Sequence, residues 1–523
     1  MQTNGQGPSE AKGTKPAAAA SAMAPASSTT ASASGRPSTP RVVIVGAGAS
    51  GLCMAVALKK AGIDSFTIFE KADGVGGTWR DNTYPGAGCD VPSHLYSFSF
   101  EPNPDWSRAY SLQPEILAYF EHCARKHDLI RHCRFRTELA SARFDEAAGL
   151  WRLVTTEGEE VAAEVLVSGV GQLNRPQYPK LPGLETFRGK TFHSARWDHS
   201  YDLTGKRVAV IGNGASALQF IPRIAPVVGH LSVFQRSANW VVPRGDRAYT
   251  AREKAWFRRS RAIRLLHRGF IYFLLEKNFF AFRPDTFIAR VMEKSARKML
   301  AEQVADPVLR DKLTPDYPVG CKRILIGDDY FPALVRENAE VVTDAIERVT
   351  EDAIVTSDGR EHEVDAIIYA TGFVTTSFLA PMKIEGRGGL PLEQAWKEGA
   401  EAYLGVAVSG FPNFFLLYGP NTNLGHNSII FMIECQVRYV MKCLEALRTK
   451  RLAWLDVRGD AMARFNEELV KDLDKSVWAS GCTSWYKTDG GRITNNWSDF
   501  TLRYWWRTRK PDLDAFNEAP RRM

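Results

Sequence analysis

Two glycine-rich loops carry the clearest chemical signal in the sequence. The first follows the apolar run Val42 to Val45 and places Gly46, Gly48 and Gly51 in the pattern G-x-G-x-x-G. Glycines at these positions allow a tight turn and let backbone N–H groups approach a pyrophosphate at the N-terminus of the following helix. A second apolar run, SFTIFE, then ends at Glu70. Together these features predict a complete dinucleotide-binding unit.

The second loop, in VAVIGNGASA, repeats this plan near the middle of the chain. Gly212, Gly214 and Ala217 stand at its three glycine positions. We expect groups of this loop, Ser216 included, to bind a second dinucleotide. Another short apolar run, LSVFQ, follows and ends at Arg236. The chain therefore predicts two nucleotide-binding units of one design.

Opposite charges stand at the ends of the second strands of the two units. Glu70 and Arg236 each lie 24 positions after the first glycine of their loop, at the place that faces an adenosine ribose. A carboxylate accepts hydrogen bonds from two free ribose hydroxyls, whereas a guanidinium pairs with a 2′-phosphate. The first unit should therefore hold a nucleotide with an unmodified ribose, such as FAD or NAD, and the second should hold NADP(H). A solvated arginine at a strand end is the alternative interpretation of Arg236.

Length, charge and cysteine spacing define the class of protein. A chain of 523 residues can form two or three domains with real cores, and its net charge of +8 is spread along the sequence. This charge suits an anionic small molecule, and we expect no nucleic-acid partner. The eight cysteines show no C-x-x-C pair or zinc spacing, which favours reduced thiols in a cytoplasmic protein without a metal site. No apolar run approaches the roughly 20 residues that a membrane-spanning helix needs.

Two regions carry no nucleotide signal. Residues 1–40 are rich in Ala, Ser, Thr and Pro, which predicts a disordered tail rather than a secretory signal. Residues 250–311 are rich in Arg, Phe and Leu and predict helices. We favour a helical insertion that packs on its own aromatic residues. The alternative is a hydrophobic substrate entrance, or a helix with basic flanks that contacts a membrane surface.

Beyond these units, the sequence resembles the class B flavoprotein monooxygenases. The stretch GVGGTWRDNTYPGAGCDVPSHLYSFSF follows the first unit, and a strand ending in ATGF follows the second. The resemblance covers residues 41 to about 510. It implies an α/β fold with two Rossmann-like domains, one for FAD and one for NADP, and a helical insertion. The implied boundaries are 41–185 and 378–523 for FAD, 186–249 and 312–377 for NADP, and 250–311 for the insertion.

The stretch FRGKTFHSARWDHS indicates a subgroup of this family. It contains Phe187, Gly189, His193, Trp197 and Asp198, the spacing found in type I Baeyer–Villiger monooxygenases. Family members with Tyr or Phe at the Trp position resemble enzymes that oxidise nitrogen or sulfur. The resemblance implies that this segment links the two domains, so His193 would help to couple their motion rather than perform the chemistry.

The resemblance also implies a catalytic pair, Asp90 in GAGCDVPS and Arg323 in VGCKRILIG. A permanently charged arginine beside the flavin favours an anionic peroxide and stabilises its adduct with a ketone. An adjacent aspartate would fix the direction of the guanidinium and moderate its charge. A surface ion pair is the alternative role for Arg323.

Four further residues are implied to bind the cofactors. Lys322 would reach the NADP 2′-phosphate, and Trp79 and Tyr84 would lie near the flavin. Trp485, in GCTSWYK, resembles a family residue in a mobile loop that folds over the nicotinamide. A plain packing role is the alternative for Trp485.

The implied reaction uses NADPH, FAD and O2. A C4a-peroxyflavin inserts one oxygen atom next to the carbonyl of a hydrophobic ketone or aldehyde and gives an ester or lactone. The main alternative is an N- or S-oxidising monooxygenase on the same fold. A disulfide reductase would need a cysteine pair beside the flavin, where Cys89 stands alone. A non-catalytic flavoprotein would have no need of the candidate arginine. The sequence indicates neither the individual substrate nor the oligomeric state.

Overall fold

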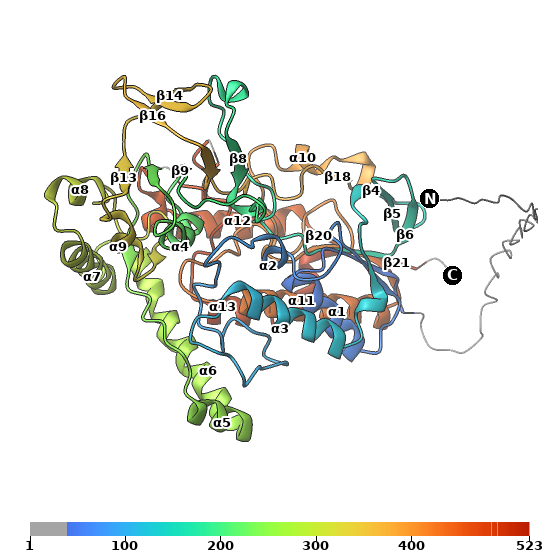
Figure 1. Ribbon diagram of the computed structural model, residues 1–523. Helices are drawn as coiled ribbons and strands as arrows, with labels where there is room; N and C mark the ends of the chain where they lie inside the picture. The colour runs from blue at the N-terminus through green and yellow to red at the C-terminus, as the bar shows by residue number, and fades with distance from the viewer. Residues whose placement is uncertain (1–38, 483, 489, 522–523) are drawn as a thin grey trace, which may run out of the picture. The chain divides into compact units, whose positions relative to one another are not determined.

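The structure is a computed structural model that describes residues 39–521 except 483 and 489 (Figure 1). The tail predicted over residues 1–40 therefore lies outside the described residues, apart from its last two. Within the described part, no helix has the length and apolar character needed to cross a membrane.

A five-stranded parallel sheet forms around the first glycine loop. Its strand order is β19-β7-β1-β2-β3. The strands are β1 (Val42–Val45), β2 (Phe66–Phe69), β3 (Cys133–Arg134), β7 (Val165–Ser168) and β19 (Phe414–Leu416). All four residues of β1 are buried, as expected for a parallel strand that is covered on both faces. Helices α1 (Ala49–Lys60) and α11 (Ile429–Thr449) pack against each other in the largest hydrophobic core.

A second five-stranded parallel sheet forms around the second glycine loop. Its order is β13-β10-β9-β17-β8. The strands are β8 (Lys190–His193), β9 (Arg207–Ile211), β10 (His230–Phe234), β13 (Ala339–Val342) and β17 (Ala366–Tyr369). Helix α4 (Ala215–Ile224) begins directly after the loop. The two sheets confirm the predicted α/β fold with two Rossmann-like halves.

Two segments of chain connect the sheets, residues 169–189 after β7 and residues 370–382 after β17. They run antiparallel beside each other. The backbone N–H of Gln177 donates to the carbonyl of Gly372 at 2.9 Å, and the N–H of Val374 donates to the carbonyl of Arg175 at 2.9 Å. The two sheets are therefore joined by a paired strap rather than by two independent linkers.

Smaller antiparallel elements surround the sheets. The first group is β4 (Leu139–Asp145), β5 (Leu150–Thr155) and β6 (Glu160–Ala163), with β18 (Lys383–Glu385) added in parallel to β4. The others are β14 (Ile346–Val349), β15 (Ala353–Thr356) and β16 (Glu361–Glu363), and the pair β20 (Leu452–Val457) and β21 (Phe516–Pro520). Strands β11 (Val241–Val242) and β12 (Leu325–Ile326) form a short parallel pair. Outside the insertion, further helices are α2 (Thr78–Asp81), α3 (Gln113–Lys126), α9 (Tyr330–Leu334), α10 (Leu392–Ala395), α12 (Gly459–Leu473) and α13 (Thr501–Arg507).

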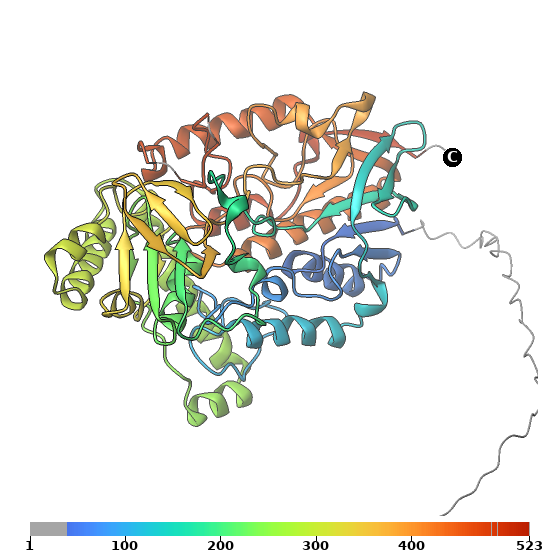
Figure 2. The same cartoon turned by 45° about the horizontal axis from the view of Figure 1, so that its top comes forward.

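The region predicted as a helical insertion is helical. It contains α5 (Ala251–Arg259), α6 (Arg261–Glu276), α7 (Phe287–Gln303) and α8 (Pro307–Lys312). Figures 1 and 2 both show α5 and α6 extending away from the sheets. The expectation that this region packs on its own aromatic residues is only partly right. Phe279 packs on Phe500, and Phe282 packs on Trp478, because the inner side of the insertion faces the C-terminal part of the chain.

One expectation about the cysteines is wrong. Cys321 and Cys482 form a disulfide that joins segments 161 positions apart, so these two thiols are not reduced. The other six cysteines of the chain, all of them described, are unpaired. The wide spacing of the two partners in the sequence gave no signal of this pairing. The expectation of a cytoplasmic location rested on reduced cysteines, and Cys321 and Cys482 do not support it.

Candidate functional site

The first loop has a backbone shape that only glycine fits. Gly46 has φ +101°, and a Cβ there would lie 2.7 Å from the carbonyl oxygen of Gly169. A Cβ on Gly51 would lie 1.9 Å from the carbonyl oxygen of Gly46, so only glycine fits at this position in the first turn of α1. Above the loop, a Cβ on Gly48 would meet only the backbone of Gly77. This open cradle of backbone fits the diphosphate of a dinucleotide.

Glu70 lies at the end of β2, beside this loop, and is almost completely buried. One carboxylate oxygen accepts from the N–H of Ala47 at 2.7 Å, and the other accepts from the N–H of Ala72 at 2.8 Å. The structure thus brings the predicted acid to the predicted loop. It also gives Glu70 a task that the sequence did not indicate, which is to hold the loop backbone in place.

The second loop repeats this geometry. Gly212 also has φ +101°, and a Cβ there would lie 2.6 Å from the carbonyl oxygen of Ala370. A Cβ on Gly214 would meet nothing within 4 Å, so the space above the loop is open. Ser216 lies in the first turn of α4 beside the hydroxyl of Tyr84.

Two cations stand together near the end of β10. Arg236 is exposed, and the ammonium of Lys322 donates to the hydroxyl of Ser237 at 2.6 Å. Burial lowers the pKa of Lys322, and the nearby charge of Arg236 lowers it further, against an opposing effect of Asp316. Within the described part of the chain, neither cation forms an ion pair. Two unneutralised cations at a nucleotide loop fit a phosphate group.

Asp90 and Arg323 form an ion pair between segments that are 233 positions apart. Nε of Arg323 donates to Oδ2 of Asp90 at 3.1 Å, and Nη2 donates to the same oxygen. Nη1 donates to the carbonyl of Leu424 at 3.3 Å. Burial favours the neutral form of each group, but the partner's charge outweighs it, so the pKa of Asp90 is lowered and that of Arg323 is raised. The pair therefore stays ionised.

Two tyrosines close to Arg323 were not identified from the sequence. Tyr486 is fully buried, and its hydroxyl lies within reach of the guanidinium. Burial raises the pKa of Tyr486 to about 12. Tyr418 lies close to the same cation, and its hydroxyl donates to Asn423 at 2.7 Å. Its place directly after β19, where the neighbouring strands also end, is the signal that could have identified Tyr418.

The structure separates the two aromatic residues that were predicted to lie near the flavin. Trp79 is the second residue of α2, close to the first loop, and its indole N–H donates to the hydroxyl of Tyr96 at 3.1 Å. Tyr84 instead contacts the second unit, where its hydroxyl donates to Gln219 of α4 at 2.9 Å. Gln219 also bonds both backbone groups of Gly88, so it fixes the loop that carries Asp90. Sequence analysis missed Gln219, which looks like an ordinary helix residue.

The segment around Trp485 lies next to the ion pair. The carbonyl oxygen of Trp485 accepts from the hydroxyl of Thr375 at 3.1 Å and from the amide of Asn495 at 2.6 Å. The Trp485 ring lies 4.5 Å from that of Tyr486. Cys482, three positions earlier, is bonded to Cys321, which directly precedes Lys322. The disulfide therefore attaches this segment to the one that carries Lys322 and Arg323.

His193 lies at the strap between the two sheets. It is fully buried, and its ring contacts Tyr178 of one connecting segment at 5.4 Å and Phe373 of the other at 5.9 Å. Its Nδ1 accepts from the N–H of Ala195. Trp197, four positions later, packs on Phe220 of α4. The stretch that holds these residues thus touches both connections and the second nucleotide unit.

Comparison with known proteins indicates the family to which this site belongs. Residues 39–384 match the family model described as flavin-binding monooxygenase-like. The chain is 47% identical over 479 residues to a Baeyer–Villiger monooxygenase of Pseudomonas aeruginosa, with 91% of each chain covered.

Solved structures agree with this match. A cyclohexanone monooxygenase from Rhodococcus bound to NADP⁺ superposes with a TM-score of 0.83 and 30% identity, over 93% of this chain and all of that one. OTEMO in complex with FAD and NADP superposes with a TM-score of 0.84 and 28% identity, over 92% of this chain and all of that one.

Proposed function

The chain belongs to the flavin-binding monooxygenase-like family and is an NADPH- and FAD-dependent monooxygenase of the Baeyer–Villiger type; we propose that its substrates are hydrophobic ketones and aldehydes. One oxygen atom of O2 enters the bond next to the carbonyl and gives an ester or lactone. The observation that carries this proposal is the buried, permanently charged Arg323, held by Asp90 close to the junction of the two nucleotide units.

We propose that each Rossmann-like half holds one cofactor. Residues 41–185 and 378–523 form the FAD-binding domain, residues 186–249 and 312–377 form the NADP-binding domain, and residues 250–311 are inserted in the latter. The acid at the end of β2 and the unneutralised cations near the end of β10 support this assignment.

The proposed cofactor contacts follow the loops. On the FAD side they are Gly46, Gly48, Gly51, Glu70 and Trp79, with Tyr84 joining that side to α4. On the NADP side they are Gly212, Gly214, Ser216, Arg236 and Lys322, with Trp485 over the nicotinamide. Bound FAD supplies the redox chemistry that activates O2, with hydride from NADPH. The backbone cradle around Gly48 and the open space above Gly214 support this fit.

Arg323 is proposed to stabilise negative charge on oxygen during attack on the carbonyl. Its guanidinium is fixed in direction by Asp90 and by the carbonyl of Leu424, so it needs little reorganisation when charge develops. Asp90 acts as a positioning residue. Tyr418 and Tyr486 cover the same cation and help to exclude water from it.

The test is oxygen transfer from labelled O2. Purified, FAD-loaded enzyme receives NADPH and cyclohexanone under ¹⁸O2, and mass spectrometry follows the lactone. We expect lactone with one ¹⁸O atom, formed in proportion to NADPH consumed. A parallel reaction with thioanisole tests sulfide oxidation. Labelled sulfoxide without any ester from a series of cyclic, linear and aromatic ketones would contradict the proposal and favour a heteroatom monooxygenase.

A further inference from the structure

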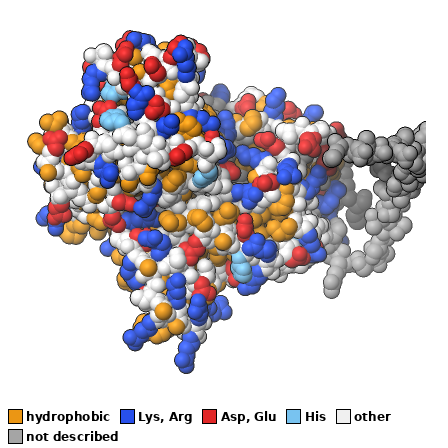
Figure 3. Space-filling model, viewed as in Figure 1, with side chains coloured by type: hydrophobic (Ala, Val, Ile, Leu, Met, Phe, Trp, Pro, Cys, Tyr) orange, Lys and Arg blue, Asp and Glu red, His pale blue; other side chains and the backbone are white. Residues whose placement is uncertain are grey.

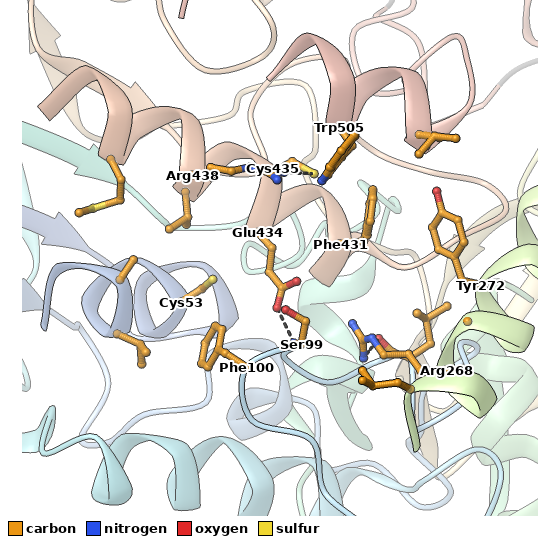
Figure 4. Close-up of a pocket in the computed structure, with 18 of the residues that line it drawn as sticks. Cys53, Ser99, Phe100, Arg268, Tyr272, Phe431, Glu434, Cys435, Arg438 and Trp505 are labelled. Atoms are coloured by element: carbon orange, nitrogen blue, oxygen red, sulfur yellow. Dashed lines mark hydrogen bonds between the residues drawn. The ribbon is translucent and has the colours of Figure 1, made fainter. Parts of the chain in front are cut away.

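A cavity of about 570 Å³ lies between α1, α6, α11 and α13 (Figure 4). None of the residues assigned above to FAD, NADP or catalysis lines it. Its volume falls within the range of about 300–1,000 Å³ that is typical of ligand pockets. It is therefore large enough for a small molecule and separate from the proposed reaction site.

Most of the cavity wall is hydrocarbon. Val56 and Ala57 of α1, Phe431 and Met441 of α11, and Trp505 of α13 line it. These side chains have no hydrogen-bonding groups that face a ligand, apart from the Trp505 indole, so this part of the wall favours an apolar occupant. The four helices thus form a lining suited to an alkyl chain.

Two charged groups reach into the cavity from opposite sides. Nη1 of Arg268 donates to the backbone carbonyls of His94 at 2.7 Å and Ser97 at 3.0 Å. The carboxylate of Glu434 accepts from the N–H of Ser99 at 2.6 Å. Figure 4 shows both side chains directed toward the same space near Ser99. Across the described residues, no ion pair within 4 Å joins them, so the cavity keeps polar groups with free bonding capacity.

The charge on the cavity wall is mainly positive. Lys60, Arg268 and Arg438 face one acid, Glu434. Lys60 lies 4.2 Å from the centre of the Phe100 ring, and Arg438 lies 5.3 Å from the centre of the Trp505 ring. In the part of the chain that the structure describes, no carboxylate pairs with any of the three cations.

The Nε atom of Arg438 is buried and has no hydrogen-bond partner. Because this atom is closed to solvent, an anion in the cavity would meet the Nη groups of the same guanidinium, of which Nη2 donates to Sγ of Cys435 at 3.4 Å. Burial raises the pKa of Glu434, and the charge of Arg268 opposes this shift; a single acid thus stands against three cations on the cavity wall. The polar part of the cavity therefore favours an anion.

The cavity opens between α6 and α13. Leu265 and Leu502 at its edge are 51% and 54% exposed. Beside them, Leu266, Phe270 and Trp506 are also exposed. Figure 3 shows hydrophobic and basic side chains mixed over the projection formed by α5 and α6. An apolar molecule with an anionic group could enter here without crossing a polar barrier.

We propose that this cavity binds a free long-chain monocarboxylate of the fatty-acid class. The alkyl chain lies between α1, α11 and α13, and the carboxylate lies at Arg438, beside Trp505. This site is additional to the reaction site, and its occupant would brace α1, the helix that begins at the first nucleotide loop.

The test is direct binding of hexadecanoate, below its aggregation limit, to the yellow holoenzyme in the presence of NADP⁺. Isothermal titration should give saturable binding with one site per chain. Arg438→Met removes the cation, and Ala57→Trp fills the cavity. We expect each to weaken binding at least 10-fold. Arg448→Met, on the exposed side of the same helix, is the matched control and should bind like the parent.

Three outcomes would overturn the proposal. Equal binding of hexadecyltrimethylammonium would show that the anionic group is not recognised. Binding only to vesicles of anionic lipid, with none of the free acid, would indicate a membrane-facing surface. Binding that a ketone substrate displaces, and that both variants retain, would place the acid in the reaction site. NADPH oxidation by each variant without added substrate reports folding separately, so weaker binding by a variant cannot be assigned to misfolding.

Discussion

At the scale of single residues, the nucleotide loops could be predicted and the ion pair could not be derived. The glycines and Glu70 act through local backbone geometry, which sequence spacing encodes directly. Asp90 and Arg323 lie 233 positions apart, and only the resemblance to a family suggested that they meet. Gln219 and Tyr486 had no local signal, because their importance depends on what the fold brings beside them.

We expect Arg323→Lys to separate NADPH consumption from oxygen transfer. Lysine keeps the charge but cannot donate to Asp90 and to the carbonyl of Leu424 at once. Ester formed per NADPH should fall by about 100-fold, with hydrogen peroxide formed instead. Gas chromatography of the ester and a peroxide assay measure this ratio. Arg387→Lys, at another arginine–carboxylate pair, is the control. An unchanged ratio in Arg323→Lys would contradict the proposed role.

Arg236→Ala should change the choice of nicotinamide cofactor. Loss of a charge-assisted contact to the 2′-phosphate costs about 1.5–3 kcal/mol, so KM for NADPH should rise roughly 10- to 100-fold. KM for NADH, which lacks this phosphate, should change little. Lys322→Ala should act in the same direction. Arg188→Ala, which breaks an exposed ion pair with Glu351, is the control. Equal changes in KM for NADPH and NADH would show that Arg236 does not contact the 2′-phosphate.

At the scale of elements, the central parallel strands could be predicted, and the edge strands β3, β8 and β13 and the antiparallel elements could not. Strands such as β1 and β9 are short buried runs that end at glycine loops, whereas β3, β8 and β13 are only partly buried. Strands β4 to β6, β14 to β16 and β20 to β21 are paired by contacts that no such sequence marker announces. The helical insertion was predicted, but its inward packing on Phe500 and Trp478 depends on the C-terminal fold.

Reduction of the Cys321–Cys482 disulfide should lower thermal stability. A crosslink across 161 positions restricts the unfolded chain, an effect of about 5 kcal/mol in the entropic model. We expect dithiothreitol to lower the unfolding midpoint of the parent protein, measured by scanning calorimetry. The Cys321→Ser variant should unfold near the midpoint of the reduced parent and should not respond to the reductant. A parent midpoint that reductant leaves unchanged would contradict this role.

At the scale of the whole molecule, two sheets are joined by a paired strap with a buried histidine against it. The stretch FRGKTFHSARWDHS predicted a link between domains. In the structure, His193 of this stretch contacts Tyr178 and Phe373, one residue on each connecting segment. The pairing of the two connecting segments could not be predicted, because they are separated by the whole second sheet in the sequence.

His193 should make stability depend on pH. Burial lowers its pKa to about 4, whereas the unfolded chain has the ordinary value near 6.5. The unfolded state therefore binds a proton first, and the free energy of unfolding should fall by about 3 kcal/mol as pH drops from 6.5 to 4. Calorimetry at pH 7.5 and 5 covers the upper part of this window, where we expect a fall of about 2 kcal/mol. His193→Gln should lose less stability over this range than the parent, whereas His122→Gln, at an exposed histidine, should match it. A parent-like pH response of His193→Gln would exclude this origin.

The order of strands in the first sheet has a consequence for the growing chain on the ribosome. Its edge strand β19 pairs with β7, although some 250 residues, including every strand of the second sheet, are translated between them. The unit that is translated first is therefore finished last. A nascent chain that stops at residue 384, where the family match ends, has all the strands of the second sheet, but the first sheet still has β7 as an open edge.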